Sequence, residues 1–183
     1  MQAIDTSILS FFTNHRTEWL NFFMLTVTYS GSYVVAGGLV FLSAISFYIH
    51  KHTGRVLQLL ISVGGAVGTT YALKHIFFRA RPLAEALYLE TGSSFPSGHA
   101  TIAMALYGFL LFALWQHDKH HFKNPLIFFL TILIALVGVS RLYLGVHYLS
   151  DVAAGYAIGF IWILISLAIS KSKIWPLRDN ERL

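Results

Sequence analysis

Five long apolar segments restrict this chain of 183 residues to folds that a lipid bilayer can accommodate. The segments are residues 33–49, 56–78, 100–116, 125–140 and 152–170. Each is close to the length of a helix that crosses the hydrocarbon core, although the third and fourth are at the short limit. Because backbone polar groups cannot stay unpaired in lipid, such segments form helices. The sequence therefore predicts an all-α integral membrane bundle with five clear transmembrane helices.

Two weaker helical segments precede these five. Residues 1–16 carry apolar side chains at helical spacing, which predicts either an interfacial helix or a helix packed on the protein's own surface. Residues 18–29 are apolar but too short to span, and Ser30-Gly31-Ser32 interrupts them. We expect a half-inserted or tilted helix there or, if the break is only a kink, one long bent element over 19–50.

The charges indicate a membrane protein with its basic residues mainly on one side. Hydrophobic residues make up 56% of the chain and charged residues 11%, and the net charge is +5. This excess fits cytoplasmic loops and anionic headgroups, so we expect membrane lipids and no nucleic acid as partners. The segments after the first, third and fifth spans hold eight of the thirteen Lys and Arg, which predicts that they are cytoplasmic. The absence of cysteine excludes disulfides and thiolate chemistry.

The third span begins after Phe95-Pro96-Ser97-Gly98-His99. A helix N-terminus offers free backbone N–H groups and the positive end of a dipole, which together suit an anion. Gly98 would let the anion approach the backbone, and His99 would place a titratable group beside it. Ser97 is positioned to cap the helix, and its hydroxyl could instead turn to a ligand. The same pattern also fits an ordinary helix start.

The second span ends in Lys74-His75-Ile76-Phe77-Phe78-Arg79-Ala80-Arg81-Pro82. Lys74 lies near the outer membrane boundary, where a charge needs a partner or water. Pro82 is expected to end the helix. Lys74 and Arg81 are two turns apart and therefore share a face, and Arg79 lies off that face. The alternative is that these cations only extend toward lipid headgroups.

The fourth span leads into Ser140-Arg141 and then to His147 and Asp151. Residues four apart can touch on a helix. A carboxylate on one imidazole nitrogen fixes the tautomer and leaves the other nitrogen free to react. The alternative is a structural His–Asp cap on the fifth span.

A chain that crosses the membrane five times brings these three stretches to the same, outer side. There they supply three cations, a helix N-terminus and two histidines. Guanidinium groups bind phosphate oxygens bidentately and stabilise the charge that develops during phosphoryl transfer. The stretches together predict a site that binds a phosphate dianion and breaks its ester or anhydride bond.

The three stretches resemble the three-part signature of the type 2 phosphatidic acid phosphatase superfamily, and the resemblance covers residues 32–170. It implies that His147 is the nucleophile and forms a phosphohistidine, that Asp151 holds its ring, and that His99 protonates the leaving oxygen. It further implies that the phosphoryl oxygens are held by Lys74, Arg81, Ser97, Gly98 and Arg141. No metal or cofactor is implied. Bacterial members usually have an extracytoplasmic site and six crossing helices. This chain has five clear spans, one fewer than that number.

The resemblance implies a lipid phosphate as substrate, at a cell membrane. Undecaprenyl diphosphate is favoured, phosphatidylglycerophosphate is the alternative, and a lipid phosphotransferase could use the same site. A path between lipid and site is expected along Phe77, Phe78, Leu83, Leu87, Tyr88 and Leu89. We divide the chain into N-terminal helices over 1–31, a membrane phosphatase domain over 32–171 and a cytoplasmic tail over 172–183.

Two other polar groups have a simpler interpretation. Glu85 and Glu90 are too few for a confident metal site and are interpreted as solvated loop charges. His117-Asp118-Lys119-His120-His121 has histidines at spacings that can bind a transition metal, but it falls in a short polar turn. A solvated loop is favoured for that segment too.

Overall fold

The computed structural model describes residues 2–82, 86–116 and 123–171, and the regular structure of these residues is helical. Leu83, Glu85, the histidine-rich segment 117–121 and the tail 172–183 lie outside the described residues. The elements are α1 (Gln2–Asn14), α2 (Glu18–Ser30), α3 (Tyr33–Ile49), α4 (Thr53–Phe77), α5 (Gly98–Ala103), the π-helical η2 (Met104–Gly108), α6 (Phe109–Trp115), α7 (Lys123–Tyr143) and α8 (Leu149–Lys171).

Within the described ranges, four helices are long and apolar enough to cross a membrane. They are Thr53–Phe77, the continuous helix Gly98–Trp115, Asn124–Tyr143 and Leu149–Ile169. The helices α2 and α3 meet the same criterion only together, with a bend of 46° between them. The predicted all-α membrane bundle is confirmed. The helix over the run 33–49 meets the criterion only together with α2, so the alternative of one long bent element describes this part of the chain.

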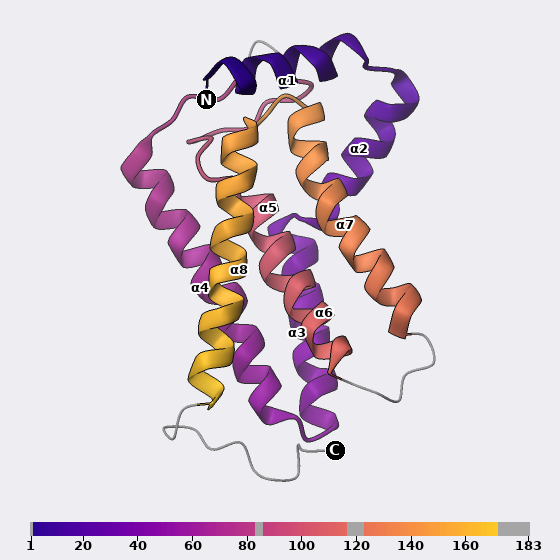
Figure 1. Ribbon diagram of the computed structural model, residues 1–183, viewed down its shortest axis with the longest axis vertical. Coiled ribbons are helices and arrows are strands. Elements are labelled where there is room, and N and C mark those ends of the chain that lie inside the picture. Colours follow the sequence, from indigo (N-terminus) through magenta and orange to yellow (C-terminus); the bar gives the residue numbers. More distant parts are fainter. Residues whose placement is uncertain (1, 83–85, 117–122, 172–183) are drawn as a thin grey trace.

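The continuous helix formed by α5, η2 and α6 runs through the centre of the bundle, where α4, α7 and α8 pack against it (Figure 1). Its side chains at Ala100, Ala103, Leu106 and Phe109 are fully buried. Pairs of outer helices, α4 with α8 and α2 with α7, close the bundle around it. The start of α5 is therefore surrounded by other helices on several sides.

Two glycines allow α8 to lie against the start of this central helix. A Cβ atom at Gly155 would lie 2.7 Å from the Ser97 carbonyl oxygen, and one at Gly159 would lie 2.7 Å from the Thr101 carbonyl oxygen. Small residues of this kind let membrane helices approach closely. The contact brings the backbone of Asp151 to the start of α5, where the Ser97 N–H donates to the Asp151 carbonyl oxygen at 3.0 Å.

The glycines of α4 behave differently from one another. The sequence predicts close helix packing at Gly64, Gly65 and Gly68. At Gly65 the prediction holds, since an added Cβ would collide with the ring of Trp162 on α8. It is wrong for Gly64 and Gly68, where no described atom lies within 4 Å of such a Cβ.

The first helix, α1, lies across one end of the bundle and packs against α7 and α8 (Figure 1). Leu9 is buried, and Ile8 and Phe12 pack against buried residues of the neighbouring helices. Ile4 and Phe11 remain exposed. Of the two alternatives for this segment, packing on the protein's own surface is therefore observed, with part of the apolar face left open.

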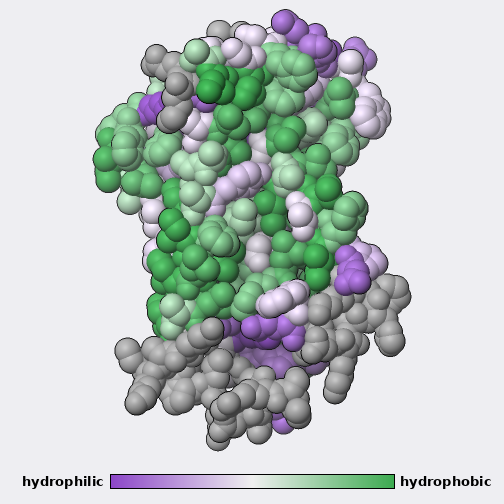
Figure 2. Space-filling view, viewed as in Figure 1, coloured by the Kyte–Doolittle hydropathy of each residue, from purple (hydrophilic) through white to green (hydrophobic). Residues whose placement is uncertain are grey.

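Hydrophobic residues cover most of the visible side of the bundle between its two ends (Figure 2). Large exposed apolar side chains occur on several helices, among them Phe41, Ile76, Phe128 and Ile161. Exposed apolar surface on this scale is typical of helices that face lipid.

Candidate active site

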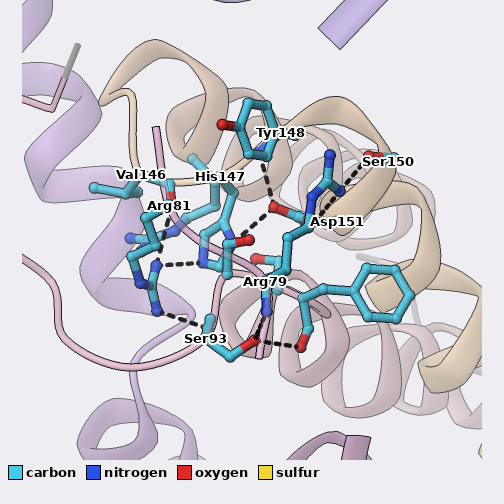
Figure 3. Close-up of polar contacts among 12 residues, drawn as sticks. Arg79, Arg81, Ser93, Val146, His147, Tyr148, Ser150 and Asp151 are labelled. Atoms are coloured by element: carbon cyan, nitrogen blue, oxygen red, sulfur yellow. Dashed lines mark hydrogen bonds and ion pairs between the residues drawn. The ribbon is translucent and has the colours of Figure 1, made fainter. Parts of the chain in front are cut away.

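The three sequence stretches meet at the end of the bundle that carries α1. Arg81 follows α4, and His147 and Asp151 lie at the junction of α7 and α8 (Figure 3). Nη1 of Arg81 donates to Nε2 of His147 at 3.1 Å and to the Val146 carbonyl oxygen at 3.0 Å. The prediction that distant segments come together is therefore confirmed for these groups.

His147 lies in the turn before α8 and not on the helix itself. The chain leaves α7 at Tyr143 and reverses through Gly145, whose φ of 72° suits glycine. Nδ1 of His147 lies 3.5 Å from Oδ2 of Asp151, and both side chains are fully buried. Oδ2 accepts a hydrogen bond from the Tyr148 N–H at 2.9 Å, whereas Nδ1 has no hydrogen-bond partner among the described residues. Asp151 thus caps the start of α8 and faces the imidazole, so the two interpretations made from the sequence are compatible.

The hydrogen bond from Arg81 assigns the tautomer of His147. A guanidinium has only donors, so Nε2 must accept and the imidazole proton must reside on Nδ1. Nδ1 is the nitrogen that faces Asp151. The lone pair of Nε2 consequently points toward the basic side chains, away from the carboxylate.

A carboxylate of the chain itself, that of Glu90, lies among these basic groups. Its Oε1 is 3.1 Å from Nη2 of Arg81 and 3.8 Å from Nε2 of His147, and its Oε2 accepts from Nη2 of Arg141. The hydroxyl of Tyr88 donates to the same Oε2 at 3.1 Å. Burial alone would raise the pKa of Glu90, but the positive charges of Arg141 and Arg81 lower it below its usual range. Glu90 is therefore ionised.

The interpretation of Glu90 as a solvated loop charge is wrong. The loop that carries it folds back on the bundle, where the Leu87 N–H donates to the Leu144 carbonyl oxygen at 2.9 Å. Its side chain is only 24% exposed. The only sign in the sequence that Glu90 belongs to the site is its place between two of the motifs. Glu85 shares that place, so the sequence could not distinguish the two residues.

Arg141 is the most deeply enclosed of the cations. Its side chain is fully buried, and Nη1 donates to Oγ1 of Thr28 and to the hydroxyl of Tyr88, both at 2.6 Å. Nε has no hydrogen-bond partner among the described residues. The last turn of α7 thus presents a guanidinium with spare donor capacity to the Glu90 carboxylate.

Lys74 and Arg81 converge by a route that differs from the predicted one. The helix α4 ends at Phe77, and Phe78 adopts the left-handed conformation with a φ of 41°. The expectation that Pro82 ends the helix, with Lys74 and Arg81 on one helical face, is therefore wrong. Both side chains nevertheless reach the Ser93 carbonyl oxygen, with Nζ of Lys74 at 2.5 Å and Nη2 of Arg81 at 3.2 Å.

The start of α5 leaves a buried hydroxyl unused. Ser97 is the N-cap residue, as predicted, but its hydroxyl makes no capping bond and has no partner among the described residues. Buried polar groups are normally paired, so this hydroxyl is available to a ligand. Gly98 lies against the hydroxyl of Tyr33, only 2.7 Å from where a Cβ would be. His99 is half-buried and close enough to Arg141, Glu90 and His147 for their charges to act on it.

Two charged residues at the site were missed by the sequence analysis. Nη1 of Arg79 donates to Oδ1 of Asp151 at 2.6 Å, and Nη2 donates to Oδ2 of Asp5 at 3.0 Å. Asp5 belongs to α1 and is buried. Neither residue belongs to the helical faces that the sequence pattern singles out, and the two positions are 74 apart in the chain.

Comparisons with known proteins identify relatives of this chain. A model of the PAP2 superfamily matches residues 55–175. The phosphatidylglycerophosphatase B of Bacillus subtilis is 30% identical over 165 residues, covering 88% of this chain and 80% of the relative. The putative undecaprenyl-diphosphatase YbjG of Escherichia coli is 30% identical over 131 residues, covering 69% of this chain and 60% of that protein.

Two solved structures are also similar. The transmembrane PAP2-type phosphatidylglycerolphosphate phosphatase of Bacillus subtilis has a TM-score of 0.85 at 28% identity, covering 97% of this chain and 89% of the other. LpxE of Aquifex aeolicus has a TM-score of 0.69 at 27% identity, covering 90% of this chain and 94% of the other.

Proposed function

This chain belongs to the PAP2 superfamily and is a membrane phosphatase of lipid phosphates, and we propose that it acts through a phosphohistidine at His147. One observation carries the proposal. Nε2 of His147 lies 3.8 Å from an oxygen of the Glu90 carboxylate, an anion that Arg81 and Arg141 bind at the same time. A phosphoryl group in the place of that carboxylate would meet the same guanidinium groups and lie in front of the nucleophilic nitrogen.

In the first step the phosphoryl group replaces the Glu90 carboxylate. Its oxygens are held by Lys74, Arg81, Ser97, Gly98 and Arg141. Nε2 of His147 attacks phosphorus, the bond to the leaving oxygen breaks, and His99 donates a proton to that oxygen. Asp151 holds the Nδ1 proton and stabilises the positive charge that the ring acquires.

In the second step water hydrolyses the phosphohistidine. His99, now deprotonated, accepts a proton from the water as its oxygen attacks phosphorus, and the bond between phosphorus and Nε2 breaks. Inorganic phosphate leaves, and the imidazole of His147 returns to its neutral form. The Glu90 carboxylate then occupies the cations again.

The substrate that we favour is undecaprenyl diphosphate. Three side chains near the predicted lipid path, Phe77, Phe78 and Leu89, are 58%, 75% and 85% exposed, as suits contact with an apolar tail. The second candidate is phosphatidylglycerophosphate, which is supported by the higher coverage of the Bacillus subtilis relative, 88% against 69% for YbjG. A phosphotransferase would differ only in the acceptor that attacks the phosphohistidine.

We place the active site on the extracytoplasmic face. The turn between α3 and α4, with Lys51, and the first turn of α4, with Arg55, lie at the end of the bundle opposite α1 (Figure 1). Positive residues mark cytoplasmic loops. The site, at the α1 end, would then face outward.

The test is phosphate release in detergent from undecaprenyl diphosphate, phosphatidylglycerophosphate and phosphatidic acid, each with and without a chelator. We expect release from at least one lipid, unchanged by the chelator, because the proposed steps use only protein side chains. Adding an acceptor lipid separates hydrolysis from transfer, since a transferase would phosphorylate the acceptor. The proposal fails if the purified protein releases no phosphate from any of the three lipids, or if the chelator stops release and added metal restores it.

The place of Glu90 leads to a further prediction. Phosphate must displace a carboxylate that two guanidinium groups bind, and a neutral amide competes less well for them. Glu90→Gln should therefore strengthen inhibition by inorganic phosphate about tenfold, which corresponds to about 1.4 kcal/mol. The measurement is the inhibition constant for phosphate. Glu18→Gln, at an exposed position at the start of α2, is the control and should leave the constant unchanged. Unchanged or weaker inhibition in Glu90→Gln would contradict the competition.

A further inference from the structure

We propose that Arg79 and Asp5 are positioning residues that hold the Asp151 carboxylate in place behind His147, so that α1 is part of the catalytic apparatus. The inference rests on the proposed function, because it gives the His147–Asp151 pair its role. Neither Arg79 nor Asp5 contacts the Glu90 carboxylate through any hydrogen bond or ion pair found among the described residues. They act through Asp151.

Both oxygens of Asp151 have fixed partners. Oδ1 accepts from Nη1 of Arg79 at 2.6 Å, and Oδ2 accepts from the Tyr148 N–H at 2.9 Å while facing Nδ1 of His147 (Figure 3). The side chain is fully buried. A carboxylate held at both oxygens cannot rotate away from the imidazole, and a guanidinium with several fixed donors is suited to hold it.

Asp5 in turn fixes Arg79 from the opposite side. Its Oδ2 accepts from Nη2 of Arg79 at 3.0 Å and from the hydroxyl of Ser150 at 2.7 Å, and its Oδ1 accepts from the Ser150 N–H at 3.1 Å. The hydroxyl of Ser150 also accepts from Nη1 of Arg79 at 2.7 Å. Asp5, on α1, is therefore connected directly to Ser150 and, through Arg79, to Asp151, both in the first turn of α8.

The burial of Asp5 is informative because an unpaired carboxylate would be costly there. Its side chain is 4% exposed. Burial alone would raise its pKa, but hydrogen bonds from Ser150 and Arg79 bring the pKa below its usual range, so the group is ionised. For Arg79, burial acts to lower the pKa, and Asp5 and Asp151 together raise it. The two groups form a charged pair next to Asp151.

The alternating charges explain why such a pair would matter to the reaction. When Nε2 attacks phosphorus while Nδ1 keeps its proton, the ring of His147 becomes positive. Asp151 stabilises that charge, but the positive Arg79 on its other oxygen works against it. The negative charge of Asp5 offsets Arg79, so the full attraction of Asp151 remains available to the ring. Asp5 should therefore affect the rate of the chemical step and not the binding of phosphate.

The test uses Asp5→Asn, which keeps the shape of the side chain and removes its charge. We expect kcat to fall about tenfold, the size of effect that partners of catalytic ligands commonly have. KM for the lipid phosphate and the inhibition constant for inorganic phosphate should stay within about twofold. Ser10→Ala, at an exposed position on the same helix, is the matched control and should leave all three quantities unchanged.

Two further variants separate positioning from a merely structural role. Asp5→Glu keeps the charge and should recover part of the lost kcat. Asp5→Asn combined with Asp151→Asn should be no slower than Asp151→Asn alone, because the pair acts through that carboxylate. If Asp5→Asn does not fold in detergent, Arg79→Lys takes its place in the test. This variant keeps the charge but loses the planar fork, and we expect the same result, a lower kcat with KM and the inhibition constant for phosphate nearly unchanged.

Three results would overturn the inference: wild-type kcat in folded Asp5→Asn, a loss of phosphate affinity equal to the loss of kcat, or full additivity in the double variant. These results leave the proposed function intact. Failure of the wild-type protein to release phosphate would instead count against the proposed function.

Discussion

Replacing His147 with alanine is expected to abolish phosphate release, with a fall in kcat of about 10⁵-fold. In the proposed mechanism the imidazole supplies the nitrogen that attacks phosphorus, so its removal leaves the first step without its nucleophile. The variant should still fold in detergent, because Asp151 keeps its hydrogen bonds from the Tyr148 N–H and from Arg79. Phosphate release and the melting temperature are the two measurements.

A matched control and a trapping experiment make this result specific. His75→Ala removes an exposed imidazole on α4 and should leave the rate unchanged. Brief reaction of the wild-type protein with a substrate labelled in its phosphoryl group should give an acid-labile phosphoprotein, which His147→Ala should not form. Normal turnover in His147→Ala, or a trapped phosphoryl group at another residue, would refute the mechanism.

Arg141→Lys should reduce kcat/KM about 10²- to 10³-fold, although it conserves the charge. The guanidinium of Arg141 donates to Thr28, Tyr88 and Glu90 from a fully buried position. An ammonium cannot reproduce that planar fork, so phosphate oxygens would lose a bidentate partner and Tyr88 would lose a donor. The measurement is the dependence of the rate on lipid phosphate concentration.

The corresponding substitution at the other end of the bundle provides the control. Arg55→Lys, near the start of α4, should change kcat/KM by less than about twofold, because Arg55 donates to Ala113 and Gln116 at the end of the bundle opposite the site. Comparison of melting temperatures separates a loss of chemistry from a loss of folding. Near-normal kcat/KM in Arg141→Lys would show that only the charge of Arg141 matters.

The parts of the fold that local patterns determine could be predicted from the sequence. The apolar runs identified the membrane helices, and the interruption at Gly31 marked the bend between α2 and α3. The start of α5 at Gly98 followed from its capping pattern, with Ser97 as the N-cap residue. These features depend on residues close together in the chain.

The remaining features depend on contacts between distant segments. Extension of α4 to Pro82 was wrong because Phe78 turns the chain into the left-handed conformation, which nothing in its composition favours. Glu90 reaches the site because the loop pairs with Leu144, which is 57 residues away from Leu87. Periodicity carries no information about such pairings, so the charges of this loop could not be placed from the sequence.

The Glu90 carboxylate also has a consequence for selection among lipids. A bilayer surrounds the protein with phosphodiester headgroups, which far outnumber any substrate and carry one negative charge on each phosphate. Exchange of a singly charged carboxylate for a singly charged diester gains little electrostatic energy, whereas a terminal phosphate brings a second charge to Arg81 and Arg141. The protein would thus resist the bulk diester lipids by charge alone, before any contact with their tails or glycerol groups.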